Sequence, residues 1–159
     1  MRKRFLIPLL AVLALPSSIN ADATNDYFLK LNQSVKLFSK GKFSEMKNIC
    51  EEIIEISPEV PNGYVCKGIA LGFTSKNKRK SREVLTNLTK AIEINPEYYE
   101  AYFFRGLLQF QMQRERNSKI DRTACSDIKK AYLNNHPLAL KYVEEKKSFL
   151  RRDRCTGFF

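Results

Sequence analysis

The side chains in this sequence with the greatest capacity for chemistry are one histidine, His136, and four cysteines, Cys50, Cys66, Cys125 and Cys155. An even number of cysteines is typical of disulfide-bonded proteins from oxidising compartments. Zinc sites instead use cysteines and histidines at close, paired spacings, which this sequence lacks. We therefore expect two disulfides and no metal. Four free thiols in the core are the alternative.

The histidine lies in the segment Asn134-Asn135-His136-Pro137, where we expect it to be a turn residue at the end of a helix. A catalytic role would require a nucleophile or a carboxylate partner, and no motif supplies one. The sequence has no glycine-rich phosphate loop, no G-x-S-x-G motif and no recognisable carboxylate pair. These features predict a protein that is not an enzyme and that uses no cofactor.

The first residues have the pattern of a secretory signal peptide. Basic residues from Arg2 to Arg4 precede an apolar run, Phe5–Leu15, and Ala21-Asp22-Ala23 fits an A-x-A cleavage site. The apolar run is shorter than the roughly 20 residues that span a bilayer. We expect cleavage after Ala21 and export to a periplasmic or other extracytoplasmic compartment, or secretion. An uncleaved anchor is the alternative interpretation.

The remaining chain has the apolar periodicity of amphipathic helices and almost no strand signal. Proline and glycine residues separate the periodic segments, which is typical of short turns between helices. The predicted helices are Asp26–Ser39, Ser44–Ile56, Tyr64–Phe73, Ser81–Ile94, Glu97–Gln113, Asp121–Leu133 and a last helix over residues 138–152.

A helical phrase that ends in proline recurs along the chain, at Gly41–Pro58, Arg82–Pro96 and Arg122–Pro137. Self-similarity at this period indicates stacked helical hairpins. The domain organisation that follows is a signal peptide at residues 1–21 and one repeat domain at residues 22–159. We place the repeats at about residues 26–59, 60–97 and 98–137, followed by the cap helix.

These repeats resemble the tetratricopeptide repeat, whose first helix carries W-x2-L-G-x2-Y and whose second helix ends in alanine and proline. Tyr64, Gly68 and Leu71 fit the first helix of the second repeat. In the first repeat, however, Lys30 replaces the tryptophan. Extra residues fall between the two helices of the second and third repeats. The resemblance implies an all-α, right-handed solenoid of about three hairpins with a C-terminal capping helix.

Hairpin geometry predicts which cysteines pair. Cys50 lies nine residues before the turn near Glu59, and Cys66 lies seven residues after it, so both reach a similar height on antiparallel helices. Cys125 lies near the start of the sixth predicted helix, and the cap helix returns the chain to that height before Cys155. We expect the disulfides Cys50–Cys66 and Cys125–Cys155.

The resemblance also implies a site, because tetratricopeptide solenoids generally hold peptides on the concave face formed by the first helices of the repeats. The Lys/Asn clamp that some members use for a peptide carboxylate is absent, so we expect a hydrophobic peptide or helix of another protein. Burial of some of these side chains in the core is the alternative. The predicted groove residues are Val65, Ile69, Phe73, Phe103, Leu107, Phe110 and Gln111.

Positive charge is concentrated in the second half of the chain. Residues 22–75 contain 6 Lys+Arg and 7 Asp+Glu, whereas residues 76–159 contain 19 and 10. Equivalent loops of a solenoid project from one edge, which would gather these cations into a basic rim. The rim residues are Lys76, Lys78, Arg79, Lys80, Arg82, Arg114, Arg116, Lys119, Arg122, Arg151, Arg152 and Arg154.

The basic rim suggests a second function, attachment to lipid headgroups, a cell-wall polymer or an acidic protein. A set of solvated loops that only aids solubility is the alternative. Nucleic acid is a less suitable partner, because the chain is expected to be exported and aromatic residues are not interleaved with the charges of the rim. No segment after the leader is apolar enough to span a membrane.

Overall fold

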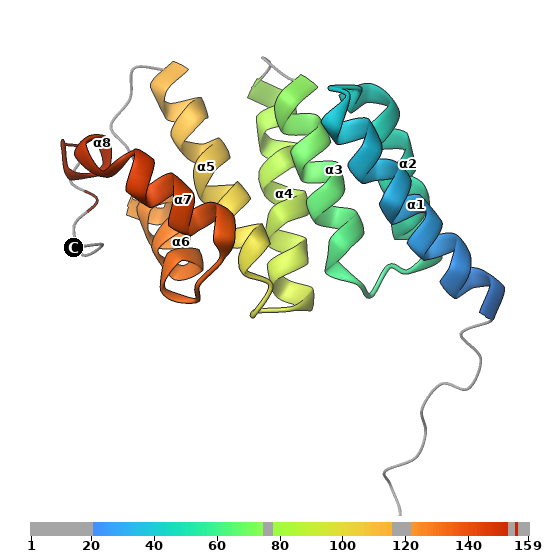
Figure 1. Ribbon diagram of the computed structural model, residues 1–159. Helices are drawn as coiled ribbons and strands as arrows, with labels where there is room; N and C mark the ends of the chain where they lie inside the picture. Colours follow the sequence, from blue (N-terminus) through green and yellow to red (C-terminus); the bar gives the residue numbers. More distant parts are fainter. Residues whose placement is uncertain (1–20, 75–77, 116–121, 153–154, 156–159) are drawn as a thin grey trace, which may run out of the picture.

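The computed structural model describes residues 21–74, 78–115, 122–152 and 155, and every regular element in them is a helix (Figure 1). None of these helices is long and apolar enough to cross a membrane. In chain order they are α1 (Ala21–Ser39), α2 (Phe43–Ile56), α3 (Pro61–Thr74), α4 (Lys78–Ile94), α5 (Tyr99–Glu115), α6 (Arg122–Leu133), α7 (Pro137–Glu145) and α8 (Lys147–Arg152).

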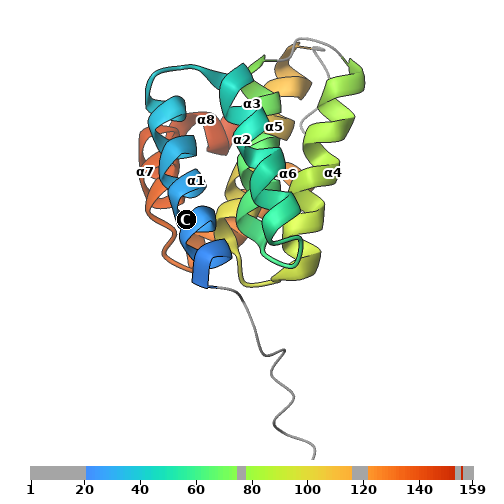
Figure 2. The ribbon, with the colours of Figure 1, turned by 90° about the vertical axis from the view of Figure 1, so that its right-hand side faces the viewer.

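The first six helices form antiparallel hairpins, α1–α2, α3–α4 and α5–α6, which stack side by side, and α7 packs against α6 (Figures 1 and 2). At the top of Figure 1, α1, α3 and α5 end and α2 and α4 begin. We call this side of the stack the upper edge. The all-α fold of helical hairpins that the sequence predicts is confirmed.

Local sequence determines where several helices begin and end. Gly41 has a φ of 68°, a left-handed conformation that a glycine adopts without strain, and it turns the chain from α1 into α2. Pro61 and Pro137 are the first residues of α3 and α7, where the missing proline N–H has no helical partner in any case.

The apolar core consists of two clusters. The larger one extends from α2 to α7 and contains Ile53, Leu88 and Phe104, among others. The smaller one joins α5 and α6 to the cap and consists of Phe110, Ala124, Ile128, Val143, Leu150 and Cys155. Helices α5 and α6 approach closely at Gly106, where a Cβ atom would lie 2.8 Å from the carbonyl oxygen of Ala124. A larger residue there would push the two helices apart.

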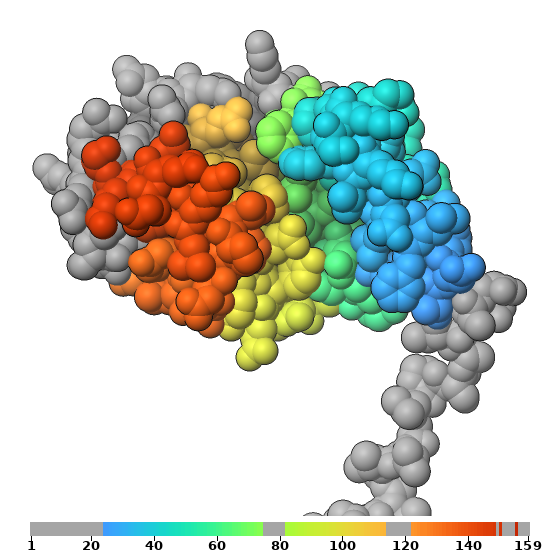
Figure 3. All heavy atoms as spheres, viewed as in Figure 1, coloured from blue at the N-terminus to red at the C-terminus, as the bar shows by residue number. Residues whose placement is uncertain are grey.

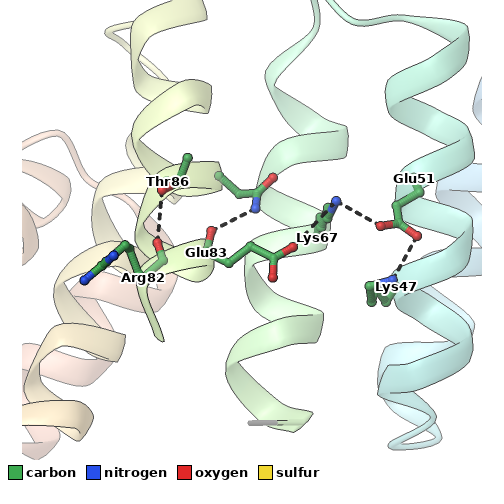
Figure 4. A network of polar contacts seen from close by, with 7 residues as sticks. Lys47, Glu51, Lys67, Arg82, Glu83 and Thr86 are labelled. Carbon is green, nitrogen blue, oxygen red and sulfur yellow. Dashed lines mark hydrogen bonds and ion pairs between the residues drawn. The ribbon is translucent and has the colours of Figure 1, made fainter. Parts of the chain in front are cut away.

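Ion pairs cross the helix interfaces beside the core. Figure 4 shows Lys67 of α3 between Glu51 of α2 and Glu83 of α4, with its Nζ atom 2.9 Å and 3.9 Å from their carboxylates. Arg105 of α5 forms a two-pronged pair with Asp127 of α6, at 2.7 and 2.9 Å. The second pair is the less exposed, and loss of one partner from such a pair leaves a poorly solvated charge.

Two predicted elements differ from the structure. The cap is two helices rather than one, because the chain bends at Lys146 and thereby turns Leu150 into the smaller core cluster. Helix α4 begins at Lys78, so Lys78, Arg79, Lys80 and Arg82 belong to this helix and not to a loop. The extra residues of the second repeat therefore lengthen a helix at its N-terminus.

Candidate functional site

Most of the predicted groove residues are not accessible to a partner. Val65, Ile69, Phe103 and Phe110 are buried, which agrees with the alternative that some of the predicted groove residues belong to the core. Val65 and Ile69 belong to the larger core cluster, to which Leu31 of α1 adds further cover. Apolar side chains of α3 and α5 thus contribute to the core at positions where the sequence predicted recognition.

The cap explains the burial of Phe103 and Phe110, the two phenylalanines of α5 that were predicted to line the groove. The rings of His136 and Tyr142 lie 5.6 Å and 5.9 Å from the ring of Phe103. Phe110 lies in the smaller core cluster, to which α7 contributes Val143 and α8 contributes Leu150. The two short cap helices therefore cover the end of the groove that the sequence assigned to α5.

Three of the predicted groove residues remain at the surface. Phe73 and Gln111 are exposed, and Leu107 is half-buried. They are joined by residues of α1 that were not among the predicted groove residues. Val35 is 65% exposed and Phe28 is 57% exposed, so α1 presents apolar side chains to solvent.

Apart from Leu29, the exposed large apolar residues of α1 lie on one face of the helix. Phe28, Leu31, Val35 and Phe38 recur at intervals of three, four and three residues, which keeps them within one stripe. Leu31 is half-buried against the core, so the stripe adjoins the body of the solenoid. The repeat register could have identified this site. Val35 precedes the predicted groove residue Ile69 by 34 residues, which is one tetratricopeptide period.

The molecular surface is hollowed on the side that Figure 3 shows, and α1, which carries the stripe, lies beside the hollow. Figure 3 shows α1 on one flank of the hollow and α6 and α7 on the other, with α3 and α5 forming its floor. A surface that is concave and lined largely by apolar side chains favours an apolar segment over a charged one. We call this site the concave face.

His136 lies in a partly buried environment at the start of the cap. Its Nδ1 atom is buried and has no hydrogen-bond partner, and burial lowers the pKa of the imidazole despite the nearby carboxylate of Glu100. In the described part of the chain, no group of three His, Cys, Asp or Glu side chains is placed to hold a metal ion. The ring of His136 instead packs on Phe103 at the start of α7.

Only part of the basic rim is described. Arg82 is exposed on α4, and Arg122 is exposed at the start of α6. Lys78, Arg79, Lys80, Arg114, Arg151 and Arg152 lie in helices, but their side chains are outside the described set. Lys76, Arg116, Lys119 and Arg154 lie outside the described residues altogether.

The four cysteines form the two pairs expected from hairpin geometry. Cys50 of α2 is joined to Cys66 of α3, and Cys125 of α6 is joined to Cys155 after the cap. The first bond lies within the larger core cluster, whereas the second ties the chain beyond α8 back to α6. Both bonds are compatible with an oxidising compartment.

Comparison with known proteins identifies the fold. No protein-family model and no curated protein matches the sequence. Solved structures do match it. The first tetratricopeptide domain of Spaghetti (RPAP3), bound to the HSP90 peptide SRMEEVD, has 18% identity and a TM-score of 0.61, over 84% of this chain and 99% of that chain. The first tetratricopeptide domain of human RPAP3 has 17% identity and a TM-score of 0.61, over 82% and 97%.

A third match is the TPR2B domain of yeast Sti1 in a pHsp70 complex, with 18% identity and a TM-score of 0.55, over 82% of this chain and 92% of that chain. At these identities the similarity concerns the fold alone. The chain therefore has the tetratricopeptide solenoid fold that its repeats suggested.

Proposed function

We propose that this protein is an exported, non-catalytic scaffold that binds an apolar segment of a partner protein on its concave face. The observation that carries the proposal is the exposure of Phe28 and Val35 on one stripe of α1. Exposed apolar side chains gathered on one face are typical of interaction sites in soluble proteins.

The dimensions of the stripe suit a helical partner. From Phe28 to Phe38, α1 rises by about 15 Å, which corresponds to about three turns of a facing helix. An amphipathic helix presents anchors at positions i, i+3, i+4 and i+7, a spacing similar to that of the stripe. Leu107 and Phe73 would add apolar contacts from α5 and α3.

The proposed partner differs in chemistry from the peptide in the RPAP3 structure. That peptide, SRMEEVD, is acidic. The side chains that we assign to the concave face, Phe28, Val35 and Leu107, are apolar and cannot form ion pairs with the carboxylates of such a peptide. We therefore expect the affinity for the partner to change little with salt, because apolar contacts are not screened.

Export forms part of the same proposal. The N-terminal leader and the two disulfides both favour an extracytoplasmic site of action. N-terminal sequencing of the protein recovered from its native compartment is expected to begin at Asp22. A sequence that begins at Met1 would contradict cleavage of the leader.

A site-specific photo-crosslinker would test the concave face. Placed at Val35, it is expected to capture a single partner through an apolar segment, both at low and at high salt. The matched control is Asn48, which is exposed on α2 away from the stripe. With the crosslinker at Val35, the substitution Phe28→Asp on the same stripe should abolish capture, and Ser44→Asp on α2 should not. Equal capture of the same proteins from both positions would refute the proposal.

A further inference from the structure

The turn between α1 and α2 alternates aromatic and basic residues. It reads Lys36-Leu37-Phe38-Ser39-Lys40-Gly41-Lys42-Phe43. Phe38 and Phe43 flank a turn that contains two exposed lysines, and Lys36 is exposed one helical turn earlier. An exposed turn at the end of a hairpin needs neither large aromatic side chains nor a run of like charges for its own stability.

The two phenylalanines are joined by a third from the next hairpin. The ring of Phe73, at the end of α3, stacks on Phe43 with centroids 4.7 Å apart and lies 5.9 Å from Phe38. Phe73 is nevertheless 52% exposed, and Phe38 is 40% exposed. The three rings therefore form one contiguous aromatic cluster on the upper edge, where both hairpins turn (Figure 1).

The charge around this cluster is positive. Residues 36–45 include three lysines and one glutamate, Glu45, which forms an ion pair with Lys42 at 2.8 Å. Lys36 and Lys40 have no acidic residue nearby in this stretch of sequence. On the opposite edge, the turns that lead into α3 and α5 carry Glu59 and Glu97 instead. The solenoid thus has edges of opposite charge, and the aromatic cluster lies on the basic one.

We propose that the upper edge, through Phe38, Phe43, Phe73, Lys36, Lys40 and Lys42, docks on a lipid bilayer that contains anionic headgroups. Aromatic rings favour the level of the headgroups, where an apolar body meets a polar layer. Lysines nearby are attracted to the negative surface potential of anionic lipids.

A bilayer fits this edge better than a folded protein does. The aromatic cluster lies on the upper edge, where two hairpins turn and where the apolar stripe of α1 ends at Phe38, so a folded partner would need a matching depression. A headgroup layer is deformable and accepts a projecting edge without one. The two kinds of residue also correspond to the two requirements of reversible membrane binding, an apolar contact and a basic patch.

Vesicle binding tests this proposal independently of the concave face. The chain from Asp22 onward is suitable, because no described core residue precedes Tyr27. It is expected to bind phosphatidylcholine vesicles that contain one-third phosphatidylglycerol, and to bind pure phosphatidylcholine at least about tenfold more weakly. Added salt should release it, since surface charges are screened.

Two sets of variants locate the contact. The double substitution Phe38→Ser and Phe73→Ser should weaken binding by about tenfold or more, because two half-exposed rings lose their apolar contact. Reversal of charge at Lys36, Lys40 and Lys42 should weaken binding by about a hundredfold, at about one factor of five for each lysine with additional repulsion.

The controls have matched chemistry elsewhere on the surface. Leu133→Ser removes an apolar side chain that is 61% exposed at the other end of a hairpin, and charge reversal at the exposed Lys90, Lys141 and Lys146 gives the same net charge. Circular dichroism checks that each variant is folded. Failure of the chain to bind anionic vesicles overturns the proposal, as does equal loss of binding in the control variants. Either result leaves protein capture at Val35 unaffected.

Discussion

Equivalent phenylalanines at the two ends of this solenoid differ in exposure to solvent. Phe38 of α1 lies four residues after Ser34, and Phe110 of α5 lies four residues after Gly106, so the two residues share one place in the repeat. Phe38 is 40% exposed, whereas Phe110 is 2% exposed. Repeat position alone therefore does not decide whether an aromatic side chain is part of a binding surface or of the core.

The difference between the two ends is the cap. Helices α7 and α8 place Val143 and Leu150 against Phe110, and the bond between Cys125 and Cys155 holds the chain beyond α8 in place. No described helix covers the corresponding stripe of α1. We infer that the C-terminal half of the molecule mainly stabilises the fold, while the N-terminal half presents the surfaces that a partner or a bilayer can contact.

The largest expected effect comes from the same substitution at the two equivalent positions. Phe110→Ala removes a fully buried ring and should lower the free energy of unfolding by about 3–5 kcal/mol. Phe38→Ala should cost only about 1 kcal/mol, because the ring is already partly hydrated. Urea denaturation of both variants measures the contrast. Equal losses of unfolding free energy would show that Phe38 is as well packed as Phe110.

The second expected effect concerns the disulfides. Non-reducing peptide mapping should recover Cys50 linked to Cys66 and Cys125 linked to Cys155, and a peptide that links Cys50 to Cys125 would contradict this pairing. Replacing both Cys125 and Cys155 by serine should reduce stability by about 3 kcal/mol, since the bond closes a loop of 30 residues.

Hydrogen exchange adds spatial resolution to that measurement. In the variant without Cys125 and Cys155, amide protection should fall first in α7 and α8, which the bond holds against α6. Replacing Cys50 and Cys66 instead should reduce protection in α2 and α3. Loss of protection across the whole chain in both variants would mean that the two ends do not open separately.

Much of the fold could be predicted because it depends on local signals. The prolines that end each repeat, the small residues at Gly68 and Gly106, and apolar periodicity together define helical hairpins. The cysteine pairs followed from the same geometry, since their heights depend only on distances from the turns. These features need no knowledge of how distant elements pack.

The site was less predictable because it depends on tertiary cover. His136 and Tyr142 cover Phe103, and no local sequence pattern predicts that α7 packs over α5. The bend at Lys146, which directs Leu150 into the core, likewise has no glycine or proline to mark it. No residue of the first repeat was predicted to line the groove, since an apolar stripe on a helix normally indicates burial.

The smallest expected effect is a pH dependence confined to the covered end. Because burial lowers the pKa of His136, the unfolded chain takes up a proton at a higher pH than the folded chain does. The contribution of the neutral ring to stability is complete above about pH 6.5 and decreases as the pH falls below that value. A protonated ring would also place an N–H at the buried Nδ1 position, which has no acceptor.

Thermal unfolding at about pH 7.5 and at about pH 5.5 measures this effect, because the chain has only one histidine and carboxylates titrate mainly at lower pH. We expect the melting temperature of the natural chain to fall on acidification, and that of His136→Gln to fall less. Hydrogen exchange should assign the loss to α7. An equal fall in both proteins would mean that protonation of His136 does not loosen the cap, and that the covered end is as insensitive to pH as the exposed one.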